Sequence, residues 1–178
     1  MKKLSMFVPH TLSILVGLFF GIQKAPAQFN SAELGVNGLT CSQCSRSVEM
    51  SLLKLDFVQE VKMNLENTAG KIVFRKNALI KLNKIAKAVT DAGFSVGSLK
   101  VSYTLSDDLS GASPVSFKGV SGLSCFVKPL TGLQKGEILL EVVNKEFMTR
   151  EEFKVWKNLI KSHCTIKHQE LYYLAPAD

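Results

Sequence analysis

The sequence predicts an α+β protein: a βαββαβ unit over residues 32–101, followed by a second small α+β region over residues 117–178. Two patterns point to this class. Runs in which apolar and polar residues alternate indicate strands, and runs with an apolar residue every three or four positions indicate helices. A length of 178 residues allows one or two small domains, and 46% hydrophobic with 21% charged residues is typical of a globular chain.

Residues 1–27 read as a signal peptide rather than as part of the fold. Two lysines come near the start, residues 11–22 are nearly all apolar, and Ala-Pro-Ala at residues 25–27 fits the small-x-small cleavage rule. The apolar stretch is about 12 residues long, against the roughly 20 needed to span a bilayer. We therefore expect export, into a periplasm if the host has one, with a first domain over residues 28–101 and no stable membrane insertion after cleavage. An uncleaved anchor is the alternative.

The first unit begins with a predicted strand at residues 32–39 and a predicted helix at residues 42–55, whose apolar residues share one face. Residues 57–65 alternate apolar and polar residues, as a half-buried strand does. A turn at residues 67–70 then leads to a paired strand at residues 71–75.

A second amphipathic helix is marked by Leu82, Ile85 and Val89 and ends near Gly93, and residues 95–101 supply a fourth strand. The order βαββαβ within about 70 residues is the split-βαβ, ferredoxin-like arrangement. It predicts two helices on one face of an antiparallel sheet.

Two cysteines, Cys41 and Cys44, lie where the first loop meets the first helix. Their spacing lets both thiols point at one small volume, where the unpaired N–H groups and the positive end of the helix dipole favour thiolate over thiol. Two thiolates suit a soft ion that accepts linear coordination, Cu(I) or Hg(II), whereas Mg²⁺ and Ca²⁺ prefer oxygen. Zn(II), a third candidate, prefers four ligands, two more than this pair supplies.

Three stretches around this pair follow a known pattern. Residues 39–44 read Leu-Thr-Cys-Ser-Gln-Cys, residues 58–65 read Val-Gln-Glu-Val-Lys-Met-Asn-Leu, and residues 92–94 read Ala-Gly-Phe. Residues 32–99 thereby resemble the heavy-metal-associated domain family, which has Met-Thr-Cys-x-x-Cys, Val-x-x-Val-x-Val-Asn-Leu and Ala-Gly-Phe/Tyr. The sequence departs from the family at the leucine of the first motif and at Arg-Lys-Asn in residues 75–77, where Tyr-Asp-Pro is commoner.

This family includes copper chaperones, the amino-terminal repeats of copper-transporting P-type ATPases and the periplasmic mercury-binding protein. The resemblance implies metal bound by Cys41 and Cys44, and as partner a metal-transporting membrane ATPase or another metal acceptor protein. Phe94 resembles the aromatic residue that screens the loop in ATPase-type members, with plain core as the alternative. Arg46, one turn into the helix, either offsets the negative charge of a bis-thiolate Cu(I) centre or is an ordinary solvated arginine.

Two other interpretations of the cysteine pair stay open. A thiol–disulfide enzyme also uses a low-pKa pair at a helix start, and an exported compartment is oxidising. A structural disulfide is the third interpretation. Against redox chemistry, no tryptophan precedes Cys41, the intervening residues are Ser-Gln rather than Gly-Pro, and the βαββαβ order differs from that of thioredoxin. In an oxidising compartment the pair would need a reductant before it could bind metal.

Residues 102–116 are rich in Ser, Asp, Gly and Pro, so we expect a linker there. Five residues beyond it match residues of the first unit at a constant offset of 84: Gly35, Val36, Gly38, Leu39 and Cys41 recur as Gly119, Val120, Gly122, Leu123 and Cys125. Lys128 stands where Cys44 would map. Residues 117–178 are therefore either a degenerate repeat that lost its metal pair, or a region that matches by chance.

The rest of this region predicts a strand at residues 136–143, a helix and a closing strand at residues 165–174. Thr149 and Glu152 form a capping box at the helix start. The apolar residues behind it, which we expect on the buried side, are Phe153, Trp156, Leu159 and Ile160.

Cys125 and Cys164 are the two remaining thiols, and in an oxidising compartment we expect a disulfide between them. The alternative is a second metal site formed by His163, Cys164 and His168, although their spacing matches no strong motif.

The sequence also argues against several functions. It contains no Ser/His/Asp set, carboxylate pair or phosphate-binding glycine loop, so we do not expect an enzyme. The formal net charge is +7, but no Arg/Lys run is interleaved with aromatic residues, so nucleic acid is not expected as a partner. We predict an exported protein that sequesters or delivers Cu(I) or Hg(II). The alternatives are a metal-sensing module whose second region docks a partner, and a thiol–disulfide redox protein.

Overall fold

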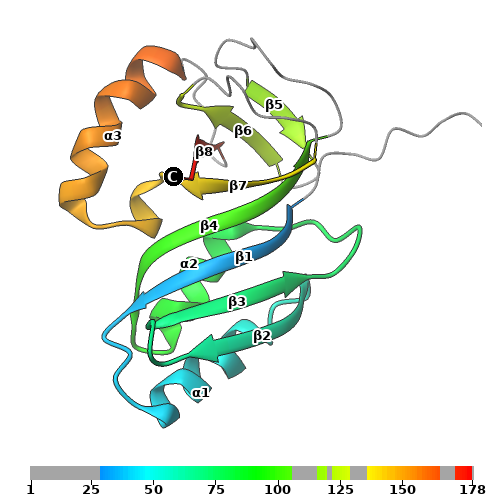
Figure 1. The fold of residues 1–178 in the computed structure, drawn as a ribbon, viewed down its shortest axis with the longest axis vertical. Helices are drawn as coiled ribbons and strands as arrows, with labels where there is room; N and C mark the ends of the chain where they lie inside the picture. The colour runs from blue at the N-terminus through cyan, green and yellow to red at the C-terminus, as the bar shows by residue number, and fades with distance from the viewer. Residues whose placement is uncertain (1–28, 106–115, 120–121, 129–135, 165–170, 178) are drawn as a thin grey trace, which may run out of the picture.

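The computed structural model describes residues 29–105, 116–119, 122–128, 136–164 and 171–177. These residues form one eight-stranded sheet in the order β2-β3-β1-β4-β7-β8-β6-β5, together with three α-helices and a short 3₁₀ helix (Figure 1). The expected signal peptide lies outside the described residues.

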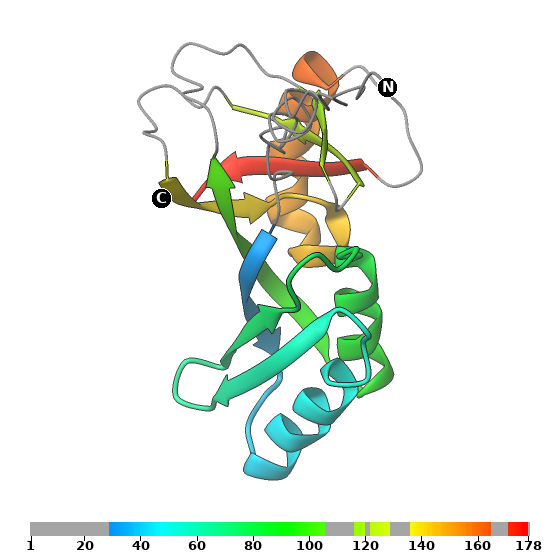
Figure 2. The ribbon, with the colours of Figure 1, turned by 90° about the vertical axis from the view of Figure 1, so that its right-hand side faces the viewer.

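The first half of the chain has the predicted βαββαβ order. Its elements are β1 (Phe29–Asn37), α1 (Ser42–Leu52), β2 (Val58–Asn64), β3 (Ala69–Phe74), α2 (Leu82–Asp91) and β4 (Ser95–Leu105). The ladders β2–β3, β3–β1 and β1–β4 are all antiparallel, and α1 and α2 cover the same face of the sheet (Figure 2). This is the ferredoxin-like arrangement, so the predicted fold class is confirmed for this half.

The core of this half lies between the two helices and the sheet. Val48 and Leu52 of α1 and Ile85 and Val89 of α2 are fully buried, and they face buried strand residues such as Leu34. Each such aliphatic side chain stabilises the fold by about 1.5 to 3 kcal/mol relative to exposure. The helical spacing of these residues is therefore what holds α1, and the loop before it, against the sheet.

Strand β4 is longer than predicted and has neighbours on both edges. Val101 pairs with Ala32 of β1 on one side and with Leu140 of β7 on the other. Residues 102–105 are thus strand rather than linker, and residues 106–115 of the expected linker lie outside the described residues. One of the polar residues of this stretch has a partner in the sheet: Ser102 is buried and its hydroxyl donates a hydrogen bond to Glu137.

The second half continues the same sheet. Its elements are β5 (Ser116–Gly119), β6 (Gly122–Phe126), β7 (Gly136–Val142), η2 (Lys145–Phe147), α3 (Arg150–His163) and β8 (Leu171–Pro176). Strand β7 is antiparallel to both β4 and β8, β6 is parallel to β8, and β5 is antiparallel to β6. The predicted capping box at the start of α3 is present.

Helix α3 lies on the sheet face opposite to α1 and α2 (Figure 1). Along β8, Tyr172 and Leu174 belong to the core of the first half, whereas Leu171 and Ala175 pack with Ile160 of α3 in a second cluster. Because successive strand residues point to opposite faces, this alternation places the two cores on the two sides of the sheet.

The two segments whose sequences match at an offset of 84 differ in local structure. Residues 38–41 form a loop that leads into α1, whereas residues 116–119 and 122–126 form two antiparallel strands. Cys125 consequently lies within a strand and is 1% exposed. A helix cannot begin here as α1 does after Cys41, because β6 is paired with β5 and β8. The two interpretations of the match, a degenerate repeat and a chance match, stay open.

Tyr103 marks the place where the two halves join. It lies on β4 opposite Ile138 of β7, is 6% exposed, and packs edge-on against Phe29 with ring centroids 5.8 Å apart. Burial raises the pKa of its hydroxyl to about 12, because the charged phenolate would lose its hydration there.

The free energy of unfolding should fall at alkaline pH, and we expect the substitution Tyr103→Phe to abolish this fall. An unfolded tyrosine titrates near pH 10, whereas the pKa of folded Tyr103 is about 12. The stability that the folded protein gains from this difference in pKa is therefore complete below pH 10 and is lost as pH rises through 12. After allowance for solvent screening, the loss should be about 1 to 2 kcal/mol. Urea unfolding at several pH values between 9 and 12 measures it. Tyr173→Phe is the matched control and should keep the loss; an unchanged decline in Tyr103→Phe contradicts the assignment.

Candidate functional site

Cys41 and Cys44 lie together at the amino end of α1. Cys41 is the N-cap residue, with extended backbone angles, and the backbone N–H of Cys44 donates to the Cys41 Sγ over 3.0 Å. The two Cα atoms are 5.1 Å apart and the sulfurs are joined in a disulfide. Cys41 is exposed, whereas Cys44 is half-buried and packs against the core. One sulfur therefore faces solvent and the other is anchored.

The surroundings of the pair favour negative charge on sulfur. The first turn of α1 contains no acidic residue, so nothing within it opposes the positive end of the helix dipole. The N–H group that donates to Cys41 Sγ adds a hydrogen bond that strengthens when the sulfur carries charge.

The loop before the pair is held by the strands behind it. Gly38 has a φ of +80°, which favours glycine, and Leu39 is 2% exposed and packs in the core beneath the loop. The Asn37 amide donates to the Val96 carbonyl of β4 over 3.4 Å. A Cβ atom at Gly97 would lie 2.6 Å from Asn37 Oδ1, so Gly97 makes room for that side chain. The leucine that departs from the family motif thus fills a core position.

Arg46 and Phe94 have structural partners of their own. The Arg46 guanidinium lies 3.1 Å from the Glu49 carboxylate on the same helix, and its side chain is 61% exposed. Phe94 is half-buried against the core and its N–H donates to the Val89 carbonyl at the end of α2. These contacts agree with the solvated-arginine and core interpretations. Charge compensation by Arg46 and screening by Phe94 stay predictions.

Cys125 and Cys164 form the second disulfide, the pairing expected from the sequence. Cys125 lies in β6 and Cys164 is the C-cap residue of α3, with Cα atoms 6.1 Å apart and exposed fractions of 1% and 8%. This bond ties α3 to the sheet. It also takes Cys164 away from the alternative site with His163 and His168, and His168 lies outside the described residues.

Within the described residues, no group of three or more His, Cys, Asp or Glu side chains is placed to hold a metal. The two sulfurs of Cys41 and Cys44 are thus a two-ligand set there, which fits ions of low coordination number better than Zn(II). Among the same residues, no helix is long and apolar enough to cross a bilayer.

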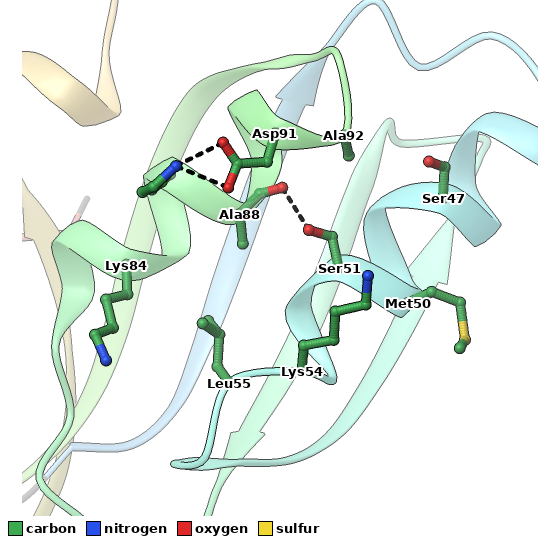
Figure 3. A pocket seen from close by; sticks show the side chains of 10 residues that line it. Ser47, Met50, Ser51, Lys54, Leu55, Lys84, Ala88, Asp91 and Ala92 are labelled. Carbon is green, nitrogen blue, oxygen red and sulfur yellow. Dashed lines mark hydrogen bonds and ion pairs between the residues drawn. The ribbon is translucent and has the colours of Figure 1, made fainter.

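A hollow of about 540 Å³ between α1 and α2 is a feature that the sequence analysis missed (Figure 3). The Ser51 hydroxyl donates to the Ala88 carbonyl over 2.8 Å and joins the two helices across it. Lys54 and Lys84 line its sides, and Lys87 is paired with Asp91. No cysteine or histidine lines this hollow, so it is separate from the cysteine pair. The hollow exists because α1 packs on α2, so a pattern within either helix does not predict it.

The first half of the chain is similar to known proteins. Residues 33–95 match the model of the heavy-metal-associated domain. The chain is 39% identical over 64 residues to the copper chaperone CopZ of Bacillus subtilis, a match that covers 35% of this chain and 90% of CopZ. It is 32% identical over 68 residues to the mercuric transport protein periplasmic component of Pseudomonas fluorescens, covering 38% of this chain and 74% of that protein.

Larger proteins match through a small part of their length. The copper-transporting ATPase RAN1 of Arabidopsis thaliana is 31% identical over 93 residues, which is 52% of this chain and 9% of the ATPase. This chain thus spans less than a tenth of that relative. The match over nine-tenths of CopZ, together with the βαββαβ sheet and the Cys-x-x-Cys pair at the start of α1, shows that the chain belongs to the heavy-metal-associated domain family.

Proposed function

We propose that this chain binds one Cu(I) ion between the thiolates of Cys41 and Cys44 and holds it for transfer to another thiol protein. The observation that supports this most directly is the N-cap geometry, in which Cys41 Sγ already accepts a backbone N–H at the positive end of α1. Such a position stabilises a thiolate, and thiolate is the form of cysteine that binds metal.

The exposure of the pair fits transfer better than permanent storage. Because Cys41 is exposed, an incoming thiolate can reach a two-coordinate ion and bind before one of the original sulfurs leaves. Cys44, packed against the core, keeps the other ligand in place during that exchange. A closed four-ligand site would block this route.

Copper and mercury are the two ions that the donor set suits, since both accept linear coordination by soft sulfur. The names of the relatives support the same pair: CopZ is a copper chaperone, and the Pseudomonas protein is a mercuric transport component. We propose Cu(I) as the ion carried and Hg(II) as an alternative.

We further propose that the chain works after export and cleavage between residues 27 and 28, and that it delivers its ion to a metal-transporting membrane ATPase or another metal acceptor protein. Several relatives are copper-transporting ATPases, which supports an acceptor of that kind. In an oxidising compartment the pair rests as the Cys41–Cys44 disulfide of the structure. Binding then requires two electrons and two protons from a dithiol reductant.

A thiol–disulfide exchange function is the second candidate, because the pair forms a disulfide with one sulfur exposed. An insulin-reduction assay separates the two candidates. Metal uptake without catalysis of insulin reduction supports the carrier, and catalysis that depends on Cys41 and Cys44 supports the redox protein.

We expect the two disulfides to be reduced in a fixed order. Reduction needs a reagent to reach a sulfur atom, and Cys41 is exposed while Cys125 and Cys164 are 1% and 8% exposed. With a limiting amount of a water-soluble phosphine, alkylation followed by peptide mapping should find labelled Cys41 and Cys44 well before the other two. Simultaneous labelling of all four cysteines contradicts this expectation.

Protein reduced in this selective way should take up one Cu(I) per chain in an anaerobic titration against a chromophoric copper chelator. Cys41→Ala and Cys44→Ala should each weaken binding by more than about 100-fold, since loss of a ligand costs more than the 10- to 100-fold typical of outer-shell changes. Gln43→Ala lies between the two ligands and is the matched control, with binding unchanged. Absence of uptake, or uptake that survives Cys41→Ala, overturns the proposal.

A further inference from the structure

Helix α3 is held against the sheet by a small apolar contact. Of its 14 residues only Ile160 is buried, while Phe153 and Trp156 are half-buried against the second cluster. Helix α2 is shorter, with 10 residues, and buries Leu82, Ile85, Ala86, Ala88 and Val89. Because tertiary packing of an apolar face supplies most of the stability of a helix in a protein, side-chain contacts hold α3 less firmly than α2.

The charge of α3 weakens the helix further. Arg150, Lys154, Lys157 and Lys161 are exposed and follow each other at steps of four, three and four positions, so like charges are neighbours on the helix. The ion pairs among the described residues all lie in the first half of the chain. Neighbouring like charges destabilise a helix, and a helix of this length is marginal in water without tertiary support.

The two ends of α3 are attached in different ways. Just before the helix, Phe147 of η2 is 1% exposed and belongs to the core of the first half. At the other end, the C-cap residue Cys164 is bonded to Cys125 of β6, 39 positions earlier in the chain. While this disulfide is intact, α3 is fixed at both ends and cannot leave the sheet as a unit. Without it, only the end near Phe147 stays attached.

We propose that the Cys125–Cys164 disulfide is a redox switch: its reduction releases α3 from the sheet while the first half of the chain stays folded. A dithiol reductant supplies two electrons and two protons, the S–S bond breaks, two thiols form, and the reductant closes into its own disulfide. The inference goes beyond the proposed function and does not rest on metal binding.

The first half does not depend on α3 for its core. From the second half of the chain, that core takes residues of β6, β7, η2 and β8, such as Val142, Phe147 and Leu174, and none of α3. The residues that α3 covers, among them Val127, Val143 and Ala175, form the separate second cluster on the other face. Release of α3 therefore uncovers the second cluster and leaves the core beneath Cys41 and Cys44 covered.

The two disulfides make this a response in two stages. Cys41 is exposed, whereas Cys125 and Cys164 are 1% and 8% exposed, so a reductant reaches the second bond only when α3 opens locally. Mild reduction frees Cys41 and Cys44 with α3 in place. Complete reduction also removes the attachment of α3.

Trp156 reports on α3 in the full chain, because it is the only tryptophan and it packs in the second cluster, with Lys128 Nζ 4.9 Å from its ring centroid. Three forms are compared: oxidised, reduced at Cys41 and Cys44 alone, and fully reduced, each identified by alkylation and peptide mapping. We expect equal quenching by acrylamide in the first two forms. In the third, quenching should increase and the emission should shift to longer wavelength, as for a solvated tryptophan.

Hydrogen exchange of a matched pair of variants locates the change. In Cys125→Ala/Cys164→Ala, amides within α3 should exchange roughly 30-fold faster or more, the lower end of what a structural disulfide contributes. Amides of Ile85 and Val89 in α2 should keep their rates. The control Cys41→Ala/Cys44→Ala also removes two sulfurs and should leave exchange in α3 unchanged.

Three results would overturn the proposal. The first is unchanged quenching of Trp156 after full reduction together with unchanged exchange in the variant without the Cys125–Cys164 bond, which would mean that side-chain contacts alone hold α3. The second is equal acceleration in α2 and α3, which would mean that the chain unfolds as a whole. The third is equal acceleration of α3 in both variants, which would show that the effect is not specific to this bond.

Discussion

The double pairing of β4 is the constraint on which the rest of the structure depends. Its ladder to β1 fixes the strand that ends in the cysteine loop, and its ladder to β7 fixes the strand through which the second half joins the sheet. Both ladders are antiparallel and meet at Val101. The sheet is therefore continuous from β2 to β5, and the metal-associated unit lacks the free edge at β4 that it would have by itself.

The two faces of this sheet support different parts of the molecule. The face covered by α1 and α2 supports the loop that presents Cys41, and its core extends into the second half through Phe147 and Tyr172. The other face carries α3, which the Cys125–Cys164 bond holds against β6. The loop that presents the cysteine pair and the strands beneath α3 thus belong to one hydrogen-bonded sheet.

The two disulfides differ in their surroundings. Cys125 and Cys164 are buried between α3 and the sheet, where the bond acts as a link between elements distant in sequence. Cys41 and Cys44 span a single helix start, close no long loop, and leave one sulfur exposed. A bond of the second kind closes a loop of only a few residues, so it constrains the unfolded chain less than the Cys125–Cys164 bond does.

The sequence by itself determined the local features, because periodicity, capping and cysteine spacing depend on residues within a few positions of each other. The βαββαβ order, the position of Cys41 and Cys44 at a helix start and the capping box of α3 follow in this way. The tertiary structure decided what depends on distant partners: the extension of β4 against β7, the parallel pairing of β6 with β8 and the hollow between α1 and α2. The alternation of residues along a strand indicates which face is buried but not which neighbouring strand supplies the hydrogen bonds. For this reason the residues after 101 resembled a linker, and residues 119–125 resembled a repeat.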